Sequence, residues 1–341
     1  MPAILSAQSL NLWYGAHQAL HDISIDIPEK SITALIGPSG CGKSTILSML
    51  AGQLAPSEGS IYIGGTIGYM LQKDYLLQWR SIRSNALLGL EIQKKLTPEN
   101  IAYVDTLLTQ YGLGDFKNSL PNQLSGGMRQ RAALIRTLAV CPDILLLDEP
   151  FSALDGYLKD VLQREMQDFL QDYPGDMILV THSRDEAYKF CKELSVVDGG
   201  RILVTDETKR LFENPRMLEA AKLTGCKNFS AVQRLGEHEI YATDWKIKLH
   251  TAEKVAEDIT HVGIRGHWIR PEDKPGENCL EVQVDEYIET TFEHQYMIRR
   301  KGEEAAAGLW WMRPKNSFRE DPDRGLPKYL YLPPEHLMLL K

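Results

Sequence analysis

The stretch GPSGCGKST, residues 37–45, contains the pattern G-x-x-x-x-G-K-[ST] and follows the apolar run ITALI, residues 32–36. Its glycines permit a tight turn in which successive backbone N–H groups point inward and form a concave site for anions. A helix expected over residues 45–50 would complete that site with its amino end. Strand, glycine-rich loop and helix in this order predict an α/β fold with a phosphate-binding loop.

The chemistry of this loop predicts a nucleotide and a metal ion. Lys43 is a compact charge that would reach the β- and γ-phosphates, and the Ser44 hydroxyl would ligate Mg²⁺. An ordinary glycine-rich turn with an exposed lysine is the alternative, and the flanking strand and helix disfavour it. The residues predicted to bind the nucleotide here are Gly37, Pro38, Ser39, Gly40, Cys41, Gly42, Lys43, Ser44 and Thr45.

Two acidic residues follow a second apolar run, ILLL over residues 144–147. A run this uniformly hydrophobic predicts a strand that is buried on both faces, as in a central parallel sheet. Asp148 would then hold the Mg²⁺ shell, and Glu149 would orient or deprotonate the attacking water. The next apolar run, residues 177–180, leads to His182, which we expect to approach the γ-phosphate. An acidic turn before a proline is the alternative, and it explains one carboxylate better than two.

A third motif, LSGGMRQR over residues 124–131, has the composition of a helix start that binds an anion. Unpaired N–H groups, a hydroxyl donor and the absence of side chains suit the close approach of a phosphate. Ser125 also suits the role of an N-cap. A cap alone does not explain the two consecutive glycines, Gly126 and Gly127.

In this order, the motifs resemble those of the nucleotide-binding subunit of an ATP-binding cassette (ABC) transporter, over the first two-thirds of the chain. Residues 37–45 resemble the Walker A loop, residues 144–149 the Walker B strand and residues 124–131 the signature. Gln72 in YMLQKD matches the Q-loop glutamine, and His182 matches the switch histidine. SALD, at residues 152–155, resembles the D-loop and contributes Asp155. Tyr14 in LWYGAHQAL resembles the aromatic residue that stacks on adenine; packing in the core is the alternative for Tyr14.

The resemblance implies an ATPase that works as a head-to-tail homodimer, with ATP and Mg²⁺ as cofactors. In such a dimer the signature of one copy closes over the ATP held by the other, so Ser125 and Gly127 serve the neighbour's nucleotide. The predicted catalytic residues are Glu149, His182 and Gln72. The predicted Mg²⁺ ligands are Ser44, Gln72 and Asp148. Nucleotide binding outside the Walker A loop is assigned to Tyr14, Ser125, Gly126, Gly127 and Asp155.

Composition and charge restrict the setting in which this ATPase works. The chain has 341 residues, which fits two domains, and its net charge of −8 disfavours a nucleic-acid partner. Its five cysteines lack C-x-x-C spacing, so neither a disulfide framework nor a zinc site is predicted. Neither a signal peptide nor an apolar run of about 20 residues is visible. We therefore expect a peripheral protein at the cytoplasmic face of the membrane. Its expected partners are integral-membrane permease subunits and, indirectly, an extracytoplasmic solute-binding protein.

The resemblance divides the chain into a nucleotide-binding domain at residues 1–225 and a carboxyl-terminal domain at 226–341. A helical subdomain is expected at about residues 73–123, with helices over 84–94 and 97–111. Its stretch Tyr75, Leu76, Leu77 and Trp79 would receive a helix of a membrane partner, or pack within the subdomain. The link from GSIYIGG to Gln72 is about ten residues shorter than the family pattern, which predicts a trimmed surface hairpin.

The carboxyl-terminal region predicts a small β-rich, barrel-like domain. Alternating residues indicate strands over 239–243, 246–250, 261–265, 280–291 and 293–300. The segments TGCKN, ATDWKIKL, VGIRGHWIRPED and LYLPPEHLMLL resemble the regulatory domain of molybdate and sulfate importer ATPases. That domain is related to oligonucleotide-fold (OB) and molybdate-binding (MOP) modules.

Two resemblances point to different cargoes. The segment YMLQKDYLLQWRSIRSNALLGLEIQ, residues 69–93, resembles the nitrate, sulfonate, taurine or thiamin-precursor branch, whereas SALDGYLK and the carboxyl-terminal region resemble the molybdate branch. The accessory domain varies between branches, so we expect uptake of a small anion such as molybdate, tungstate or sulfate. A soluble ABC ATPase without a transport role is the third alternative. It is disfavoured because such proteins usually carry two cassettes or a long coiled-coil insertion.

Overall fold

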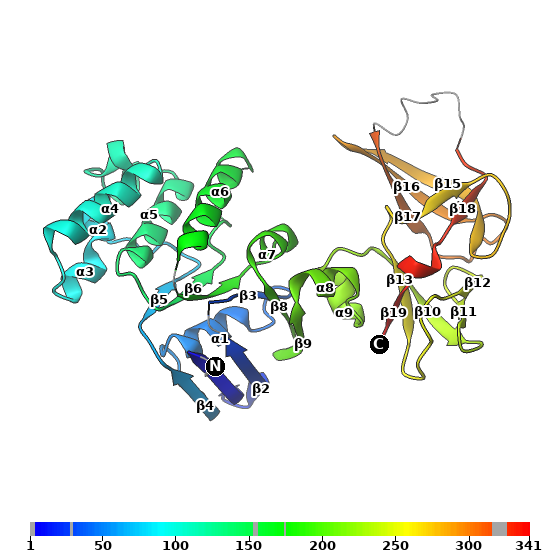
Figure 1. Ribbon diagram of the computed structural model, residues 1–341, viewed down its shortest axis with the longest axis horizontal. Helices are drawn as coiled ribbons and strands as arrows, with labels where there is room; N and C mark the ends of the chain where they lie inside the picture. Colours follow the sequence, from blue (N-terminus) through cyan, green and yellow to red (C-terminus); the bar gives the residue numbers. More distant parts are fainter. Residues whose placement is uncertain (1–3, 28–29, 153–155, 174, 316–325) are drawn as a thin grey trace. The chain divides into compact units, whose positions relative to one another are not determined.

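The computed structural model describes residues 4–27, 30–152, 156–173, 175–315 and 326–341 (Figure 1). The chain divides into two compact units, Met1–Lys209 and Arg210–Lys341. In this described part, none of the helices combines the length and the apolarity needed to span a membrane.

The first unit contains a six-stranded sheet with the order β5-β6-β7-β3-β8-β9, in which only β9 runs antiparallel to its neighbour. Every residue of β6 and β7 is buried, as the apolar runs before Asp148 and Thr181 predict. The strands are β3 (Ile32–Ile36), β5 (Ile67–Met70), β6 (Ile144–Asp148), β7 (Asp176–Val180), β8 (Glu193–Asp198) and β9 (Arg201–Glu207). The predicted α/β fold around a parallel sheet is confirmed.

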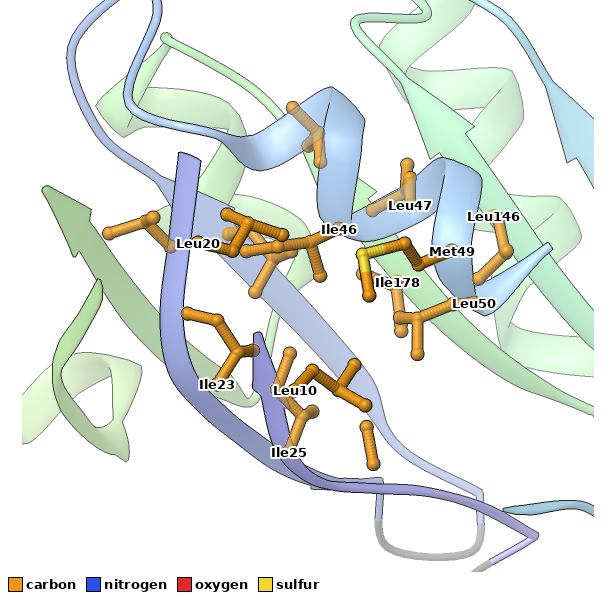
Figure 2. Close-up of a cluster of buried hydrophobic side chains, with 14 of the residues drawn as sticks. Leu10, Leu20, Ile23, Ile25, Ile46, Leu47, Met49, Leu50, Leu146 and Ile178 are labelled. Atoms are coloured by element: carbon orange, nitrogen blue, oxygen red, sulfur yellow. The ribbon is translucent and has the colours of Figure 1, made fainter. Parts of the chain in front are cut away.

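A second sheet covers the helix that follows the phosphate loop. Its antiparallel strands have the order β2-β1-β4, with β1 at Leu5–Tyr14, β2 at His17–Ile27 and β4 at Glu58–Ile63. Figure 2 shows Leu10, Leu20 and Ile23 of this sheet facing Ile46 and Met49 of helix α1 (Lys43–Leu50). Burial of side chains of this size stabilises a fold by about 1.5–3 kcal/mol each, so α1 and the loop before it are firmly held.

Four helices form the helical region of the first unit: α2 (Ile82–Ala86), α3 (Leu88–Ile92), α4 (Pro98–Gln110) and α5 (Gly126–Leu138). The helix expected over 97–111 is confirmed as α4, with Thr97 as its N-cap and Gly112 at φ 67° just after it. The single helix expected over 84–94 is wrong. It is divided at Leu87, whose ψ of −8° departs from the helical value, and it begins earlier because Ser81 caps it. Helices α6 (Gly156–Asp172) and α7 (Arg184–Phe190) follow β6 and β7.

The second unit consists mainly of two five-stranded antiparallel sheets. Their orders are β12-β11-β10-β13-β19 and β14-β18-β15-β16-β17. The five expected strands are present as β11 (Glu239–Ala242), β12 (Ile247–His250), β13 (His261–Ile264), β15 (Cys279–Glu289) and β16 (Glu293–Arg300). Sequence reasoning missed β10 (Asn228–Arg234), β14 (Arg270–Glu272), β17 (Leu309–Pro314), β18 (Tyr329–Tyr331) and β19 (Met338–Leu340). Trp245 and Trp311 are fully buried in the core of this unit.

Two short helices, α8 (Thr208–Glu213) and α9 (Leu218–Leu223), lie around and after the division between the compact units and before the boundary expected from the sequence. The compact units divide after Lys209, whereas the sequence places the boundary after Gly225 and assigns a closing helix over 215–223 to the first domain. Arg265 of the second unit donates hydrogen bonds to the carbonyl oxygens of Phe212 and Thr224, at 2.5 and 2.7 Å. These charge-assisted bonds and the packing of α9 tie the segment to the second unit.

Candidate nucleotide and catalytic site

The phosphate loop connects the carboxyl end of β3 to the amino end of α1, and its shape requires glycine. A Cβ atom at position 37 would lie 2.0 Å from the carbonyl oxygen of Val197 in β8, which no other residue could accommodate. Gly42, the N-cap of α1, has φ 107°, in the left-handed region that disfavours residues with a side chain. The loop therefore lies directly against the sheet, and its free N–H groups are at the start of a buried helix.

Lys43 is buried within this loop. Its ammonium donates hydrogen bonds to the carbonyl oxygens of Gly37 and Pro38, both at 2.9 Å, and lies 3.6 Å from the Sγ atom of buried Cys41. A group of residues on the rim of the loop is exposed instead: Pro38, Ser39, Gly40 and Ser44. The loop thus presents a polar outer face, with a positive charge directly beneath it.

Two of the predicted catalytic side chains contact the carboxylate of the third. Strands β5, β6, β7 and β3 are parallel neighbours, so their carboxyl ends reach the same edge of the sheet, where ligands of open α/β sheets bind. The Nε2 atom of Gln72 donates to Oε2 of Glu149 at 3.1 Å. Nδ1 of His182 lies 3.4 Å from Oε1 of the same glutamate. The residues assigned to catalysis are therefore gathered at the edge from which the phosphate loop starts.

Asp148, the last residue of β6, has properties that fit a metal ligand. Its side chain is 2% exposed, and burial raises its pKa above the ordinary value, although Ser44 and Lys43 oppose that shift. Among the described residues, its Oδ1 atom is buried and has no hydrogen-bond partner. A buried carboxylate oxygen without a partner next to a serine hydroxyl suits a hard cation such as Mg²⁺, which prefers oxygen ligands. The residues present thus fit the predicted ion.

The signature motif lies at the amino end of α5. Ser125 is the N-cap and accepts a hydrogen bond from the backbone N–H of Met128 at 3.3 Å, so the capping role allowed by the sequence is real. Ser125 and Gly126 are exposed. In the described part of the chain, Arg129 and Gln130 near this end of α5 donate side-chain hydrogen bonds to Leu124, Asp74 and the carbonyl oxygen of Gln72. Ser125 and Gly126 therefore lie at the surface, at the amino end of α5.

The remaining predicted residues lie as follows. Tyr14 is 56% exposed at the end of β1, so its ring does not belong to the core. Asp155 lies outside the described residues. In the stretch expected to receive a membrane partner, Tyr75 and Trp79 are exposed, whereas Leu76 is buried and packs within the unit. Residues 64–66 alone join β4 to β5, in line with the short link seen in the sequence.

Sequence reasoning missed a buried carboxylate that fixes the turn carrying His182. Glu186 in α7 accepts a hydrogen bond from the hydroxyl of Thr181 and forms an ion pair of 2.6 Å with Lys159 of α6. Its backbone N–H donates to Oγ of Ser183, the N-cap of α7. The spacing of Ser183 and Glu186 is that of a capping box, and this signal was available in the sequence.

Several known proteins have sequences similar to that of this chain. The model of the ABC transporter family matches residues 20–152. The ABC transporter ATP-binding protein YtlC of Bacillus subtilis (strain 168) is 42% identical over 244 residues, covering 69% of this chain and 90% of YtlC. The chain belongs to the ABC transporter ATP-binding proteins. This family couples ATP hydrolysis to transport, so the protein is an ABC ATPase and binds ATP.

Importer subunits are among the similar proteins. The putrescine transport ATP-binding protein PotG of Escherichia coli (strain K12) is 31% identical over 307 residues, covering 85% of this chain and 81% of PotG. The sulfate/thiosulfate import ATP-binding protein CysA of Nocardia farcinica is 38% identical over 213 residues, which cover 59% of this chain and 64% of CysA. Among solved structures, a post-hydrolysis dimer of the cassette MJ0796 with ADP and Pi has a TM-score of 0.55 and 25% identity, over 60% of this chain and 98% of that one. These similarities confirm the cassette fold and the importer-type family.

Proposed function

We propose that this chain is the ATP-hydrolysing subunit of an importer and works as a head-to-tail homodimer at the cytoplasmic face of a membrane. Separate integral-membrane permease subunits would form the channel, and an extracytoplasmic solute-binding protein would act on them. One observation carries the catalytic part of the proposal: Gln72 and His182 both contact the Glu149 carboxylate at the sheet edge where the phosphate loop begins. This arrangement suits a glutamate that activates water beside the γ-phosphate.

The proposed roles follow from the positions of the side chains. The N–H groups of residues 37–45 hold the phosphates, and the Lys43 ammonium exchanges the carbonyl oxygens of Gly37 and Pro38 for phosphate oxygens. The exposed ring of Tyr14 stacks on adenine. Glu149 orients or deprotonates the attacking water. His182, whose side chain is 62% exposed, contacts the γ-phosphate.

Mg²⁺ would be held by Ser44 and Asp148, with Gln72 as the third ligand. When bound, the ion supplies positive charge that offsets the charge of the phosphates during transfer. The Oε1 atom of Gln72 would be the ligand, and its Nε2 atom donates to the Glu149 carboxylate here.

A second copy of the chain completes each nucleotide site in this proposal. Ser125, Gly126 and Gly127 bind the ATP held by the partner, and Asp155 adds to that contact. The exposure of Ser125 and Gly126 at a helix amino end supports this role. The solved cassette dimer with ADP and Pi provides a precedent in a similar protein.

The test of this function is Glu149→Gln. We expect the variant to bind ATP as the parent does, to hydrolyse it about 10²- to 10⁴-fold more slowly, and to accumulate as a dimer in Mg²⁺ and ATP. Glu91→Gln, on an exposed ion pair away from the site, is the control and keeps parental hydrolysis. Hydrolysis by Glu149→Gln at the parental rate would show that the assignment of Glu149 is wrong. A Glu149→Gln protein that stays monomeric, even beside its permease, rules out the dimer.

For the cargo, we propose a small oxyanion such as molybdate, tungstate or sulfate. The carboxyl-terminal domain, which we propose to be related to OB and MOP modules, and the sulfate/thiosulfate import relative support it. Residues 69–93 support the alternative of nitrate, a sulfonate, taurine or a thiamin precursor. The exposed rings of Tyr75 and Trp79 are the proposed contact with a permease helix.

Reconstitution with the co-purifying permease tests the cargo. Molybdate, tungstate or sulfate should raise ATP turnover in vesicles. Stimulation by nitrate or taurine alone would favour the alternative branch, and stimulation by putrescine, the cargo named for PotG, would refute an anion. Failure of any permease to co-purify would favour an ABC ATPase without a transport role.

A further inference from the structure

The first turns of α5 are fastened to the segment that carries Gln72. Nε of Arg129 lies 3.0 Å from Oδ2 of Asp74, and Nε2 of Gln130 donates to the carbonyl oxygen of Gln72 at 3.4 Å. Further along α5, Arg136 donates to the carbonyl oxygens of Asp74 and Tyr75, at 2.8 and 3.0 Å. Three side chains of one helix thus hold the segment of residues 72–75, which follows β5.

Arg129, itself part of the signature motif, also contacts the first residue of that motif. Its Nη1 atom donates to the carbonyl oxygen of Leu124, the residue directly before Ser125, at 3.0 Å. A cation near the amino end of a helix is disfavoured by the helix dipole, so this position needs a compensating anion. Asp74 supplies that anion, and charge-assisted hydrogen bonds of this kind are stronger than neutral ones. The guanidinium therefore bridges Asp74 and the residue at which the signature begins.

Asp74 is itself fixed in place. Its Oδ1 atom accepts a hydrogen bond from the backbone N–H of Leu76 at 3.1 Å, and its carbonyl oxygen is held by Arg136. Leu76 is buried, so this turn is anchored to the core of the unit. The segment between Gln72 and α5 is therefore held by contacts, so a displacement of Gln72 would also displace α5.

We propose that Asp74 and Arg129 are positioning residues that pass the movement of Gln72 to Ser125 and Gly126. The inference rests on the proposed function, because only in the head-to-tail dimer do Gln72 and Ser125 serve different ATP molecules. Within one chain, the ion pair then links the nucleotide bound by that chain to the nucleotide bound by its partner. This link makes the two sites hydrolyse ATP cooperatively.

The test combines Asp74→Asn and Arg129→Gln in the full chain. Asp74→Asn keeps a side-chain oxygen for the Leu76 N–H and removes only the charge. We expect each single variant to lower kcat about three- to tenfold, to change KM for ATP less than about twofold, and to bring the Hill coefficient for ATP toward about 1. The double variant should be no worse than either single one, because all three lose the same link. Arg129→Lys, which keeps the charge but not the forked donors, should be intermediate.

Asp105→Asn is the matched control. It breaks the Arg83–Asp105 ion pair, which joins α2 to α4 in the same helical region and has side-chain exposures of 35% and 35%, against 35% and 24% for Arg129 and Asp74. It should leave kcat and the Hill coefficient unchanged. An equal loss in Asp105→Asn, or single-variant losses that multiply in the double variant, would overturn the proposal.

A second measurement separates this inference from the proposed function. The two substitutions are placed in the Glu149→Gln chain, and the dimer is measured in Mg²⁺ and ATP. If the Glu149→Gln chain forms no dimer, the proposed function is wrong, and so is this inference, which depends on it. A dimer of normal stability, together with unchanged kcat and Hill coefficient in the active chain, overturns the ion-pair link alone. Loss of hydrolysis in Arg129→Gln but not in Asp74→Asn also overturns it, because Arg129 would then act without Asp74.

Discussion

At the residue scale, two adjacent carboxylates at the end of β6 have opposite surroundings. Asp148 is buried, and Glu149 is held by Gln72 and His182. Glu149 also has φ 51°, a left-handed conformation that is unusual for a residue with a side chain and is often found at functional sites. The sharp change of direction between the two residues sends one carboxylate below the phosphate loop and the other to the catalytic edge.

Asp148→Asn should stabilise the nucleotide-free protein while lowering Mg²⁺-dependent hydrolysis by at least about 10- to 100-fold, the loss typical for a residue that supports a metal ligand. Burial raises the pKa of Asp148, so the ionised form destabilises the fold above that raised pKa. The neutral amide of asparagine avoids the free-energy cost of burying a charge. The gap in Tm between variant and parent should be largest at neutral pH. It should narrow as the pH falls through the raised pKa and close below 3.8, the ordinary value, where the aspartate is mostly neutral in both states. Calorimetry across this pH range, together with an ATPase assay, checks both effects.

Asp143 lies just before the other end of β6. Its substitution by asparagine is a control for which the opposite change in Tm is expected. The backbone N–H and hydroxyl of Thr66 donate to its carboxylate and lower its pKa. The charged form therefore stabilises the fold above the ordinary pKa, and this contribution is lost as the pH falls through the lowered value. Asp143→Asn should lower Tm at neutral pH. A lower Tm for Asp148→Asn as well would contradict the burial argument.

At the element scale, the phosphate loop is shaped by its neighbours as much as by its own glycines. Helix α1 is enclosed by apolar side chains of β1, β2, β6 and β7 (Figure 2). On the other side of the loop, β8 leaves no room for a side chain at position 37. The backbone N–H groups of the loop are therefore held in place before any phosphate arrives, which lowers the entropy that binding has to overcome.

Gly37→Ala should lower the free energy of unfolding by about 1–3 kcal/mol or more and abolish ATP binding, because its Cβ meets the Val197 carbonyl oxygen. Gly52→Ala is the control. Gly52 follows α1 at φ 72° with open space around its Cβ position, so alanine there costs about 1 kcal/mol and spares ATP binding. Denaturant unfolding and a nucleotide-binding assay check the pair. Equal effects of the two substitutions would contradict the role of β8.

Elements with a strong local pattern could be predicted from the sequence, whereas the three-residue strands and the longer β10 and β17 were missed. The apolar runs of β6 and β7 and the capped helix α4 are local signals. Strands β14, β18 and β19 are three residues each, and β19 pairs with β13 from more than 70 positions away. Such strands are defined by their partner, so neither composition nor alternation marks them in the chain.

At the scale of the whole molecule, the chain is two units that each have their own apolar core. The segment with α8 and α9 belongs to the second of them. Leu218 and Ala221 pack against Met338 and Leu340, near the end of the chain. Arg265 adds hydrogen bonds to two carbonyl oxygens of the segment.

A fragment of residues 210–341 should therefore be more stable than a fragment of residues 226–341. The shorter one loses the α9 packing and leaves the Arg265 guanidinium without these acceptors, which lowers the free energy of unfolding by about 2–4 kcal/mol. Denaturant unfolding of both fragments, followed by Trp fluorescence, measures the difference. Equal stability would support a boundary after Gly225 instead.

The amino-acid sequence alone predicts the chemistry of the site and the class of fold that carries it. Glycines, a lysine, two acidic residues and a capping serine each have local meaning, because backbone freedom, charge and hydrogen-bonding capacity belong to the residue. Which of these residues contact one another depends on the folded chain. Gln72 and Glu149 are 77 positions apart, and Asp74 and Arg129 are 55 apart. These pairs form because parallel strands bring their ends to one edge and α5 packs beside it, an outcome of long-range pairing that no local pattern contains.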